Sequence, residues 1–520
     1  MNPPRGFSFT IVFLFGAVVL LPIFYMLLMP FRADTAEQFG ELFAVFDSRH
    51  IGLAKNSLEL AGGAALLSII VGVPLASLIS RTDLWGKRVI GVAYFIPVLI
   101  PPYIHAIVWT HMGPFIEHNF FFDIHSLAGA ILVLTLSYFP FVTIMTIAGL
   151  KSIDRNLEEA SFLSHNRFQT FYKITIPLIT PHIISGAIFV FVFSVINVSV
   201  PDILRVKVYP LEIFIQFSAF YNEKAATLLS LPLIGVTFVL IALQKFYMKD
   251  RSYIQISAGI KKYSKYKLGV FNIVALIFCI AILCFSVIVP VAVLIKTAGG
   301  LDTYIRVLST SSDQICYSVI LAFCGAVLTM FLGFSLAYLI DRLKGRPMVF
   351  LSWATFLPLS IPATTLGIGL IGVWNRPVAD LVYSSSIIIV LGYIARFIPY
   401  SVIVLGSGLK QVDRRLEEAA FLAGSYWSNM IRKIVIPLLR HNLFAVFFIV
   451  FVLSFGELGT TLLIIPPGRE TIPIKAYNLM HYGADQMVAA LCLILVTLIL
   501  AISGVFLIFH KKMFRIAEIK

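Results

Sequence analysis

Charged residues are scarce in this sequence: they make up 13% of its 520 residues, whereas hydrophobic residues make up 59%. The mean hydropathy is +0.94. A soluble fold of this length needs far more polar surface, so these values exclude a soluble class. The apolar runs are long and continuous rather than alternating, which argues against a transmembrane β-barrel. We therefore predict an all-α, polytopic helical membrane protein.

Several chemical motifs are also missing. The five cysteines lie in or beside apolar stretches without paired spacing, which indicates small buried side chains rather than disulfides or metal ligands. The sequence has no G-x-x-x-x-G-K-[ST] motif, so we expect ATP to bind a separate chain and no cofactor to bind this one. No Ser/His/Asp, Cys/His or H-E-x-x-H arrangement stands out, which disfavours an intramembrane enzyme.

Apolar stretches predict the membrane topology. The N-terminal stretch, residues 7–31, is too long for a cleaved signal peptide and is counted as the first span. Twelve spans of about 20 residues are expected, near residues 9–30, 54–80, 88–110, 127–149, 182–204, 226–247, 269–295, 315–340, 348–374, 384–407, 441–465 and 487–509. Of the 40 Lys and Arg residues, 28 fall on the termini and on the connections after even-numbered spans. This bias predicts that both termini are cytoplasmic, and it explains the net charge of +14 without nucleic acid.

The sequence contains an internal repeat. Residues 149–163 and 408–422 are identical at 11 of 15 positions. The repeat extends further, because residues 57–81 mirror residues 318–342 at an offset that stays between 259 and 261. We predict two parallel permease-like units, residues 1–250 (core about 54–247) and 268–520 (core about 315–509), joined by a basic cytoplasmic linker at 251–267.

The most conspicuous repeated segments are polar, and we name them the first insert (residues 149–179) and the second insert (residues 408–439). Asp154 and Asp413 are expected to cap helices that lie along the membrane surface, each with a pair of glutamates in its first turns. Gly424 predicts a turn, and Pro437 interrupts the helix where the chain re-enters the membrane. We predict that the inserts are docking sites for two copies of a soluble partner; plain amphipathic surface helices are the alternative.

The second insert resembles a known motif. Its pattern of Glu418-Ala419-Ala420, Gly424, Ile434 and Pro437 is similar to the "EAA" loop of ABC-transporter permeases of the binding-protein-dependent import class. In that family the loop docks into a groove on a cytoplasmic ATPase. The resemblance therefore implies that ATPase coupling is carried by Glu158, Glu159, Ala160, Ile174, Pro177, Glu417, Glu418, Ala419, Ala420, Gly424, Ile434 and Pro437. The first insert departs from the pattern, with Ser164-His165-Asn166 in place of the turn glycine.

Two further sites are candidates for contact with cargo. Glu457, expected inside the eleventh span, and its counterpart Asn197 are placed to line a translocation path; alternatively, Glu457 forms a structural pair with Arg396. On the outer side, His118 and His125 belong to a group of imidazoles and acids near His111. Metal contact there and an ordinary polar loop are both conceivable, and we assign no metal ligand.

The resemblance also suggests a cargo. Fusion of two permease units is similar to the iron(III) importers, and also to thiamine and some phosphonate importers. The segments 465–471 and 477–484 look most like the iron(III) group. We expect a multi-pass permease of the bacterial inner membrane that works with two copies of an ATPase and an extracytoplasmic binding protein. The cargo is iron(III) or, alternatively, thiamine, a phosphonate or a polyamine. An ion-gradient-driven secondary transporter that uses Glu457 is the alternative class.

Overall fold

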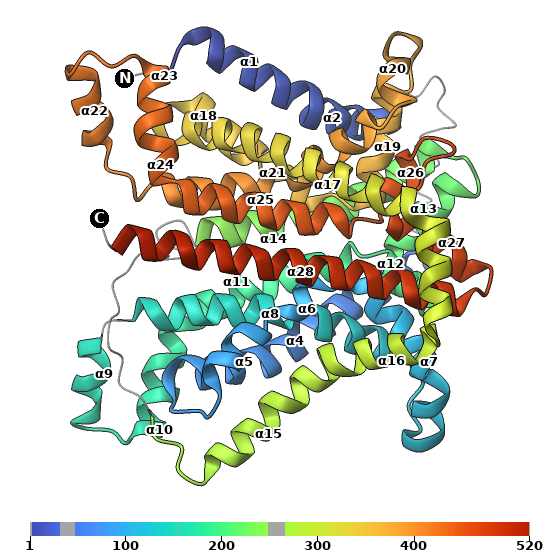
Figure 1. Ribbon diagram of the computed structural model, residues 1–520, viewed down its shortest axis with the longest axis horizontal. Coiled ribbons are helices and arrows are strands. Elements are labelled where there is room, and N and C mark those ends of the chain that lie inside the picture. Colours follow the sequence, from blue (N-terminus) through green and yellow to red (C-terminus); the bar gives the residue numbers. More distant parts are fainter. Residues whose placement is uncertain (1–2, 32–46, 154, 248–265, 519–520) are drawn as a thin grey trace. The chain divides into compact units, whose positions relative to one another are not determined.

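The computed structural model describes residues 3–31, 47–153, 155–247 and 266–518, and the regular elements within these ranges are helices (Figure 1). Nine of the described helices are long and apolar enough to cross a membrane, and the number reaches twelve when three bent pairs are each counted as one span. The all-helical fold and the count of about twelve spans are thus confirmed. The predicted basic linker lies, up to residue 265, outside the described residues.

Two of the expected spans contain a bend, and another is entered through one. The third span bends by 90° and the ninth by 112°, and a 75° bend lies between Leu438 and Arg440, just ahead of the expected eleventh span. Pro101 and Pro362 stand at the first two breaks, where a missing N–H and a fixed φ interrupt the helix. The pieces are α5 (Lys87–Ala93), α6 (Ile96–Leu99) and α7 (Pro102–Phe120); α18 (Arg346–Ala354), η5 (Leu357–Ser360) and α19 (Ala363–Trp374); and α23 (Trp427–Met430), η7 (Ile431–Val435), α24 (Ile436–Leu438) and α25 (Arg440–Phe455).

Two expected spans end earlier than the hydropathy indicates. Helix α11 (Ile176–Val195) stops before residue 204, and α25 stops before residue 465. A short helix follows each of them, α12 (Ser199–Ile203) after α11 and α26 (Thr461–Ile464) after α25. The predicted boundaries were wrong here because a turn within an apolar stretch leaves mean hydropathy unchanged.

Contacts divide the chain into two compact units, and each unit draws on both sequence halves. One comprises Met1–Val45, Ile213–Gly235 and Ala298–Lys520; the other comprises Phe46–Glu212 and Val236–Thr297. The second insert therefore shares a unit with the first span, and the first insert shares a unit with the seventh span. The predicted division at residues 250 and 268 describes the sequence repeat, whereas packing exchanges the leading span of each half.

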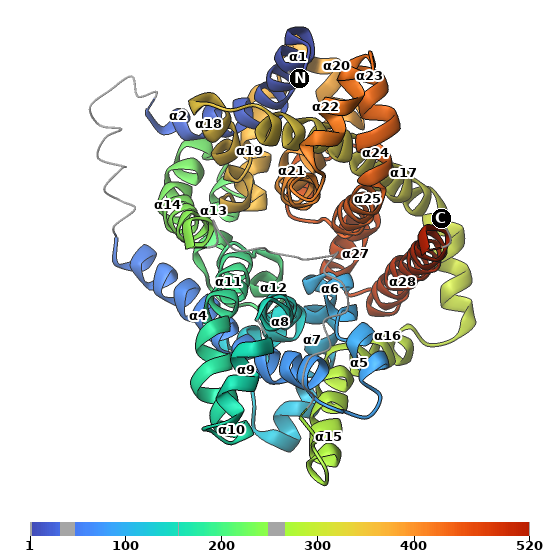
Figure 2. The ribbon, with the colours of Figure 1, turned by 90° about the vertical axis from the view of Figure 1, so that its left-hand side faces the viewer.

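The unit with the second insert is built on three long helices that lie side by side: α17 (Leu301–Arg342), α21 (Ile387–Leu409) and α25. Helices α21 and α25 are seen nearly end-on in Figure 2. A Cβ atom on Gly333 of α17 would meet Ser401 Oγ of α21 at 2.0 Å, so only glycine permits this approach. The first span joins this unit, because α2 (Leu21–Leu28) packs on α19, where a Cβ on Gly369 would lie 2.5 Å from the Pro22 carbonyl oxygen.

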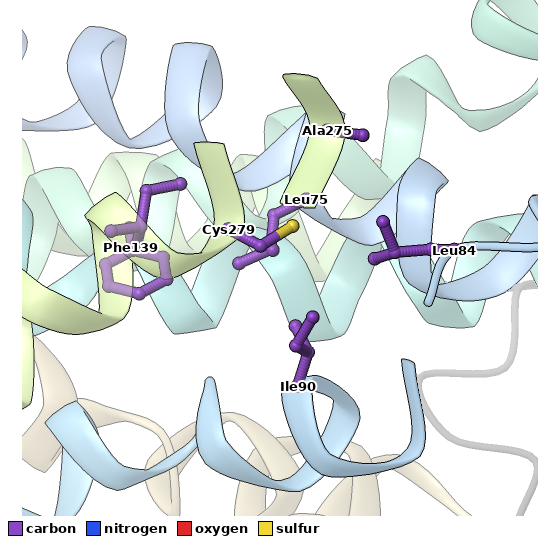
Figure 3. Packing of buried hydrophobic residues seen from close by; sticks show 7 residues of the cluster. Leu75, Leu84, Ile90, Phe139, Ala275 and Cys279 are labelled. Atoms are coloured by element: carbon purple, nitrogen blue, oxygen red, sulfur yellow. The ribbon is translucent and has the colours of Figure 1, made fainter. Parts of the chain in front are cut away.

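The unit with the first insert has a corresponding core. Helices α4 (Ser48–Arg81), α8 (Leu127–Ser152) and α11 contact one another, and α15 (Phe271–Leu283) of the seventh span packs on α4 and α8. Figure 3 shows the buried cluster that joins α15 to the first-half helices, with Cys279 next to Leu75 and Phe139. Cys279 is a free thiol in this apolar setting, in agreement with its predicted role as a small buried side chain.

Candidate functional site: the two polar inserts

The second insert begins with a capped helix, α22 (Arg414–Leu422), that projects beyond the ends of α24 and α25 (Figure 1). The Asp413 carboxylate accepts a 2.9 Å hydrogen bond from the Arg415 N–H, which confirms the predicted N-cap. At the other end Gly424 has φ +78° and donates to the Phe421 carbonyl at 2.9 Å. The next N–H, of Ser425, donates to the Ala420 carbonyl at 3.0 Å. Together these bonds form a Schellman motif that stops the helix.

Glu417, the first glutamate of the pair, points into the protein. Its Oε1 accepts from Arg342 Nε at 2.9 Å and its Oε2 from the Tyr338 hydroxyl at 3.1 Å. Arg342 Nη2 lies 2.6 Å from the same Oε1, and both partners are buried. Arg414 adds a bond to the Arg342 carbonyl. A buried carboxylate persists only where it is paired and hydrogen-bonded, so this network anchors α22 to the last turns of α17.

The remaining residues of α22 form an outward face. Glu418 and Ala419 are exposed, and Ala420 is half-buried. Phe421 and Leu422 follow them, and Leu422 is 86% exposed. Apolar side chains presented beside charges on a small helix are typical of a surface that another protein covers. The glutamate pair is therefore split, with Glu417 holding the helix from within and Glu418 available outside.

The return to the membrane has the same geometry in both inserts. Each passes through one π-helical turn, η3 (Phe171–Thr175) in the first and η7 in the second. The turn widens because Pro177 and Pro437, two residues after each turn ends, lack an N–H and clash with the preceding carbonyl in an ordinary helix. The motif residues occupy matching environments, since Ile174 and Ile434 are half-buried and both prolines are exposed.

The first insert is closed by side-chain hydrogen bonds instead of a glycine. Helix α9 (Arg155–Phe162) ends without a left-handed residue in the described stretch from Ser161 to Asn166, where the His165 N–H donates to the Ser161 carbonyl at 2.8 Å. The Ser161 and Thr170 hydroxyls are buried and lie 2.8 Å apart. This pair ties α9 to α10 (Arg167–Thr170). Only Ala160 of the predicted motif on α9 can be placed, and it is exposed.

The next helix starts with a reciprocal cap. The Gln169 N–H donates to Asn166 Oδ1 at 2.8 Å, and the Asn166 N–H donates to Gln169 Oε1 at 3.3 Å. This capping box gives α10 a fixed start. Asp154 lies outside the described residues, as do the side chains of Glu158 and Glu159, although their backbone lies in α9.

The two path candidates cap short helices. Glu457 lies in the break between α25 and α26, outside the regular span that was expected to contain it. Its oxygens accept from the Thr460 N–H at 2.7 Å, the Thr461 N–H at 2.9 Å and the Thr461 hydroxyl. Arg396 Nε lies 3.8 Å away, which supports the structural pair. Asn197 has the corresponding position before α12, where its Oδ1 accepts from the Val200 N–H at 2.9 Å.

The imidazoles near the end of α7 lie beside a turn that leads into α8. Within the described ranges, no group of three or more His, Cys, Asp or Glu side chains is placed to hold a metal ion. The Asp123 carboxylate accepts from the His125 N–H at 2.7 Å and so closes the turn before α8. His118 and His125 are exposed. These contacts agree with the ordinary polar loop.

Arg342 and Tyr338 are functional candidates that the sequence analysis missed. Arg81 and Arg342 were counted among the Lys and Arg residues of the connections, whereas both are buried at the ends of α4 and α17. Arg81 Nη2 donates to the Leu150 carbonyl at 2.6 Å. A signal was present in the repeat, since the two arginines end the mirrored stretches 57–81 and 318–342.

Comparison with known proteins adds a functional context. The chain is 23% identical over 501 residues to the Fe(3+)-transport system permease protein FbpB 2 of Haemophilus influenzae, covering 94% of this chain and 95% of that protein. It is 25% identical over 544 residues to the ferric transport system permease protein FbpB of Actinobacillus pleuropneumoniae, covering 94% and 77%. A putative 2-aminoethylphosphonate transport system permease protein, PhnV of Salmonella typhimurium, is 27% identical over 194 residues, or 36% of this chain and 71% of that protein.

The family described as "Binding-protein-dependent transport system inner membrane component" matches twice, at residues 64–253 and 329–515. Each match contains one insert with its anchored helix and its π-helical return. Members of this family are transport subunits rather than enzymes. The chain therefore belongs to the binding-protein-dependent transport system inner membrane components, as a multi-pass inner-membrane permease component of an ABC importer.

Proposed function

We propose that this chain is the membrane subunit of an ATP-driven iron(III) importer. In this proposal a binding protein delivers cargo from outside, one copy of a cytoplasmic ATPase binds each insert, and ATP binds only to those partners. The observation that carries the ATPase part is the second insert, whose helix is anchored inward by Glu417 and Arg342 while Glu418 and Leu422 face outward.

The inward anchor supports a mechanical role. A docked ATPase that pushes on the outer face of α22 acts on a helix joined to α17 by a buried ion pair and a tyrosine hydroxyl. Since α17 spans the membrane, displacement of α22 changes the packing of the helix bundle rather than a loose surface loop. The chain carries one insert in each half. The proposal therefore has two copies of the ATPase, one for each insert.

Two observations bear on the cargo. Relatives that cover most of this chain are named as iron(III) transport permeases, whereas the phosphonate relative covers about a third of it. Both oxygens of Glu457 accept hydrogen bonds within the protein. We therefore expect cargo selection to rest with the binding protein rather than with this carboxylate.

The decisive experiment is purification of the tagged chain from native membranes with mild detergent. We expect an ATPase at two copies per chain and a binding protein that retains iron(III), measured by mass spectrometry of the subunits and of bound metal. Radioactive iron(III) should enter proteoliposomes only when MgATP is on the ATPase side. Thiamine, a phosphonate or a polyamine on the binding protein would replace the iron assignment.

An ion-gradient mechanism makes the opposite prediction. Uptake in ATP-free proteoliposomes, driven by an ion gradient and abolished by Glu457→Gln, would overturn the ATPase part of the proposal. Orientation is tested separately with a cysteine at position 418, which should react with an impermeant maleimide only from the cytoplasmic side. Labelling from outside would contradict the proposed docking face.

A further inference from the structure

Each insert is contacted by an aromatic side chain that lies at, or just ahead of, the start of the leading span of the other half. The Phe7 ring lies 4.8 Å from the Trp427 ring of the second insert, measured between centroids. The Tyr266 ring lies 6.2 Å from Phe162 and 6.4 Å from Phe171 of the first insert, edge-on to both. The partners lie at different places in the two inserts, because Trp427 begins α23, whereas Phe162 ends α9 and Phe171 begins η3. The two contacts are therefore of the same kind without being copies of one another.

Both rings lie near the start of a leading span, although not at matching positions: the π-helical turns of the two spans, η1 (Gly16–Leu20) and η4 (Cys284–Ile288), are 268 residues apart, whereas the rings are 259 apart. Phe7 lies in the first turns of α1 (Arg5–Phe15), where the first span begins. Tyr266 lies just ahead of α15, where the seventh span begins. These are the spans that the compact units exchange. Each ring thus meets an insert at the point where the exchanged span reaches it.

The Phe7 contact continues into the buried anchor of the second insert. The Trp427 ring lies 6.2 Å from the Tyr338 ring, and the Tyr338 hydroxyl donates to Glu417 at 3.1 Å. A continuous set of contacts therefore joins the start of the first span to the ion pair that holds α22. Tilted aromatic pairs at such distances add stabilisation beyond the apolar area that they bury.

The Tyr266 ring is presented by a fixed backbone. The Tyr266 N–H donates to the Arg81 carbonyl at 2.7 Å, and the Asp83 N–H donates to the Tyr266 carbonyl at 3.3 Å. The Asp83 carboxylate also accepts from the Leu268 N–H at 2.9 Å. These bonds hold residues 266–268 against the connection that follows α4. The ring is thereby held in place between the two aromatic side chains of the first insert.

We infer that Phe7 and Tyr266 are positioning residues, each of which holds the insert of the opposite sequence half in place. The leading span of one half thereby sets the position of the docking helix encoded by the other half. A displacement of one insert therefore acts on the leading span of the other half, and that half carries the other insert. The consequence for ATPase coupling rests on the proposed function, whereas the positioning itself does not.

The test is amide hydrogen exchange on the full-length chain in lipid nanodiscs. Phe7→Ala should speed exchange in residues 414–430 by about tenfold, as expected if local opening becomes easier by about 1.4 kcal/mol, and leave residues 155–170 unchanged. Tyr266→Ala should do the reverse. Phe7→Tyr and Tyr266→Phe keep the ring and should restore the original rates.

Matched controls are available on the same segments. Phe9 and Phe271 are 74% and 75% exposed, and their replacement by alanine should leave exchange in both inserts unchanged. The inference is overturned if Phe7→Ala acts on the first insert, if either alanine variant speeds both inserts alike, or if neither changes exchange. General destabilisation would produce the second pattern, so a structural defect is not mistaken for positioning.

A second arm measures MgATP hydrolysis by the purified complex with its ATPase bound. Both alanine variants should lower hydrolysis at least several-fold, and both ring-retaining variants should recover it. Failure of the unsubstituted chain to retain an ATPase would count against the proposed function and leave the exchange result standing. If each alanine variant speeds exchange only in the insert that its ring contacts, and hydrolysis is unchanged, the two rings position the inserts but do not contribute to ATPase coupling.

Discussion

The two inserts share a sequence pattern but close their surface helices in different ways. The second ends α22 with a left-handed glycine, Gly424. The first uses a hydroxyl pair, Ser161 with Thr170, and a capping box. Both nevertheless return to the membrane through a π-helical turn ahead of a proline. The comparison teaches that the position of the insert and its path back to the membrane are retained in the two halves, while the local means of closing the turn differs.

The largest effect is expected from Arg342→Ala. This change leaves the Glu417 carboxylate buried without its cation, which costs about 3–5 kcal/mol. The midpoint temperature of thermal unfolding of the purified chain should fall markedly, and the ATPase should no longer co-purify with the chain. Arg415→Ala, at an exposed neighbour, is the control and should change little. The double variant Arg342→Met, Glu417→Leu should recover folding, because no buried carboxylate is left without its cation and Asp341, which loses its 2.6 Å contact with Arg342, is only partly buried; a double variant as unstable as Arg342→Ala would contradict the anchor.

Gly424→Val should have the next largest effect. A β-branched residue at φ +78° costs about 1–3 kcal/mol. A Cβ there meets nothing within 4 Å, so the cost comes from the backbone alone. The equivalent change in the first insert, Ser164→Val, should be near neutral because no left-handed residue closes that turn. Protease sensitivity of the two inserts measures both, and equal effects would erase the contrast.

Asn166→Ala probes the capping box of the first insert. Loss of an N-cap side chain costs about 1 kcal/mol, so amide exchange in residues 167–170 should rise about fivefold. Asn429 is an exposed asparagine inside α23 rather than at its N-cap, and Asn429→Ala should leave exchange there unchanged. Equal responses at the two asparagines would show that the cap is not what fixes α10.

The smallest effect on stability is expected from substitutions on the outward faces. Leu422 and Leu163 are 86% and 91% exposed, so Leu422→Ser and Leu163→Ser should leave thermal unfolding unchanged. Each should weaken ATPase binding by about tenfold if the partner buries the side chain, since burial of a leucine contributes about 1.5–3 kcal/mol. Surface plasmon resonance with the purified ATPase measures this. Unchanged affinity in both variants would place the docking surface elsewhere.

Much of the fold follows from local sequence. The spans are runs of apolar residues long enough to cross a bilayer, and the caps at Asp413 and Gly424 follow from the chemistry of single residues. Helix breaks were harder to predict. Pro101 and Pro362 signal theirs, whereas the break at Glu457 depends on a carboxylate that satisfies two N–H groups of the next helix. Hydropathy alone cannot distinguish such a turn from a continued span.

The sequence by itself determined the membrane class, the internal repeat and the location of both inserts, because composition and periodicity are properties of contiguous residues. Only the tertiary structure decided that Glu417 faces inward while Glu418 faces outward, and that the leading span of each half packs with the insert of the other. The physical reason is that the exposure and pairing of a side chain depend on partners far along the chain. Arg342 lies 75 residues from Glu417 in the sequence, and Phe7, which contacts Trp427, lies near the N-terminus.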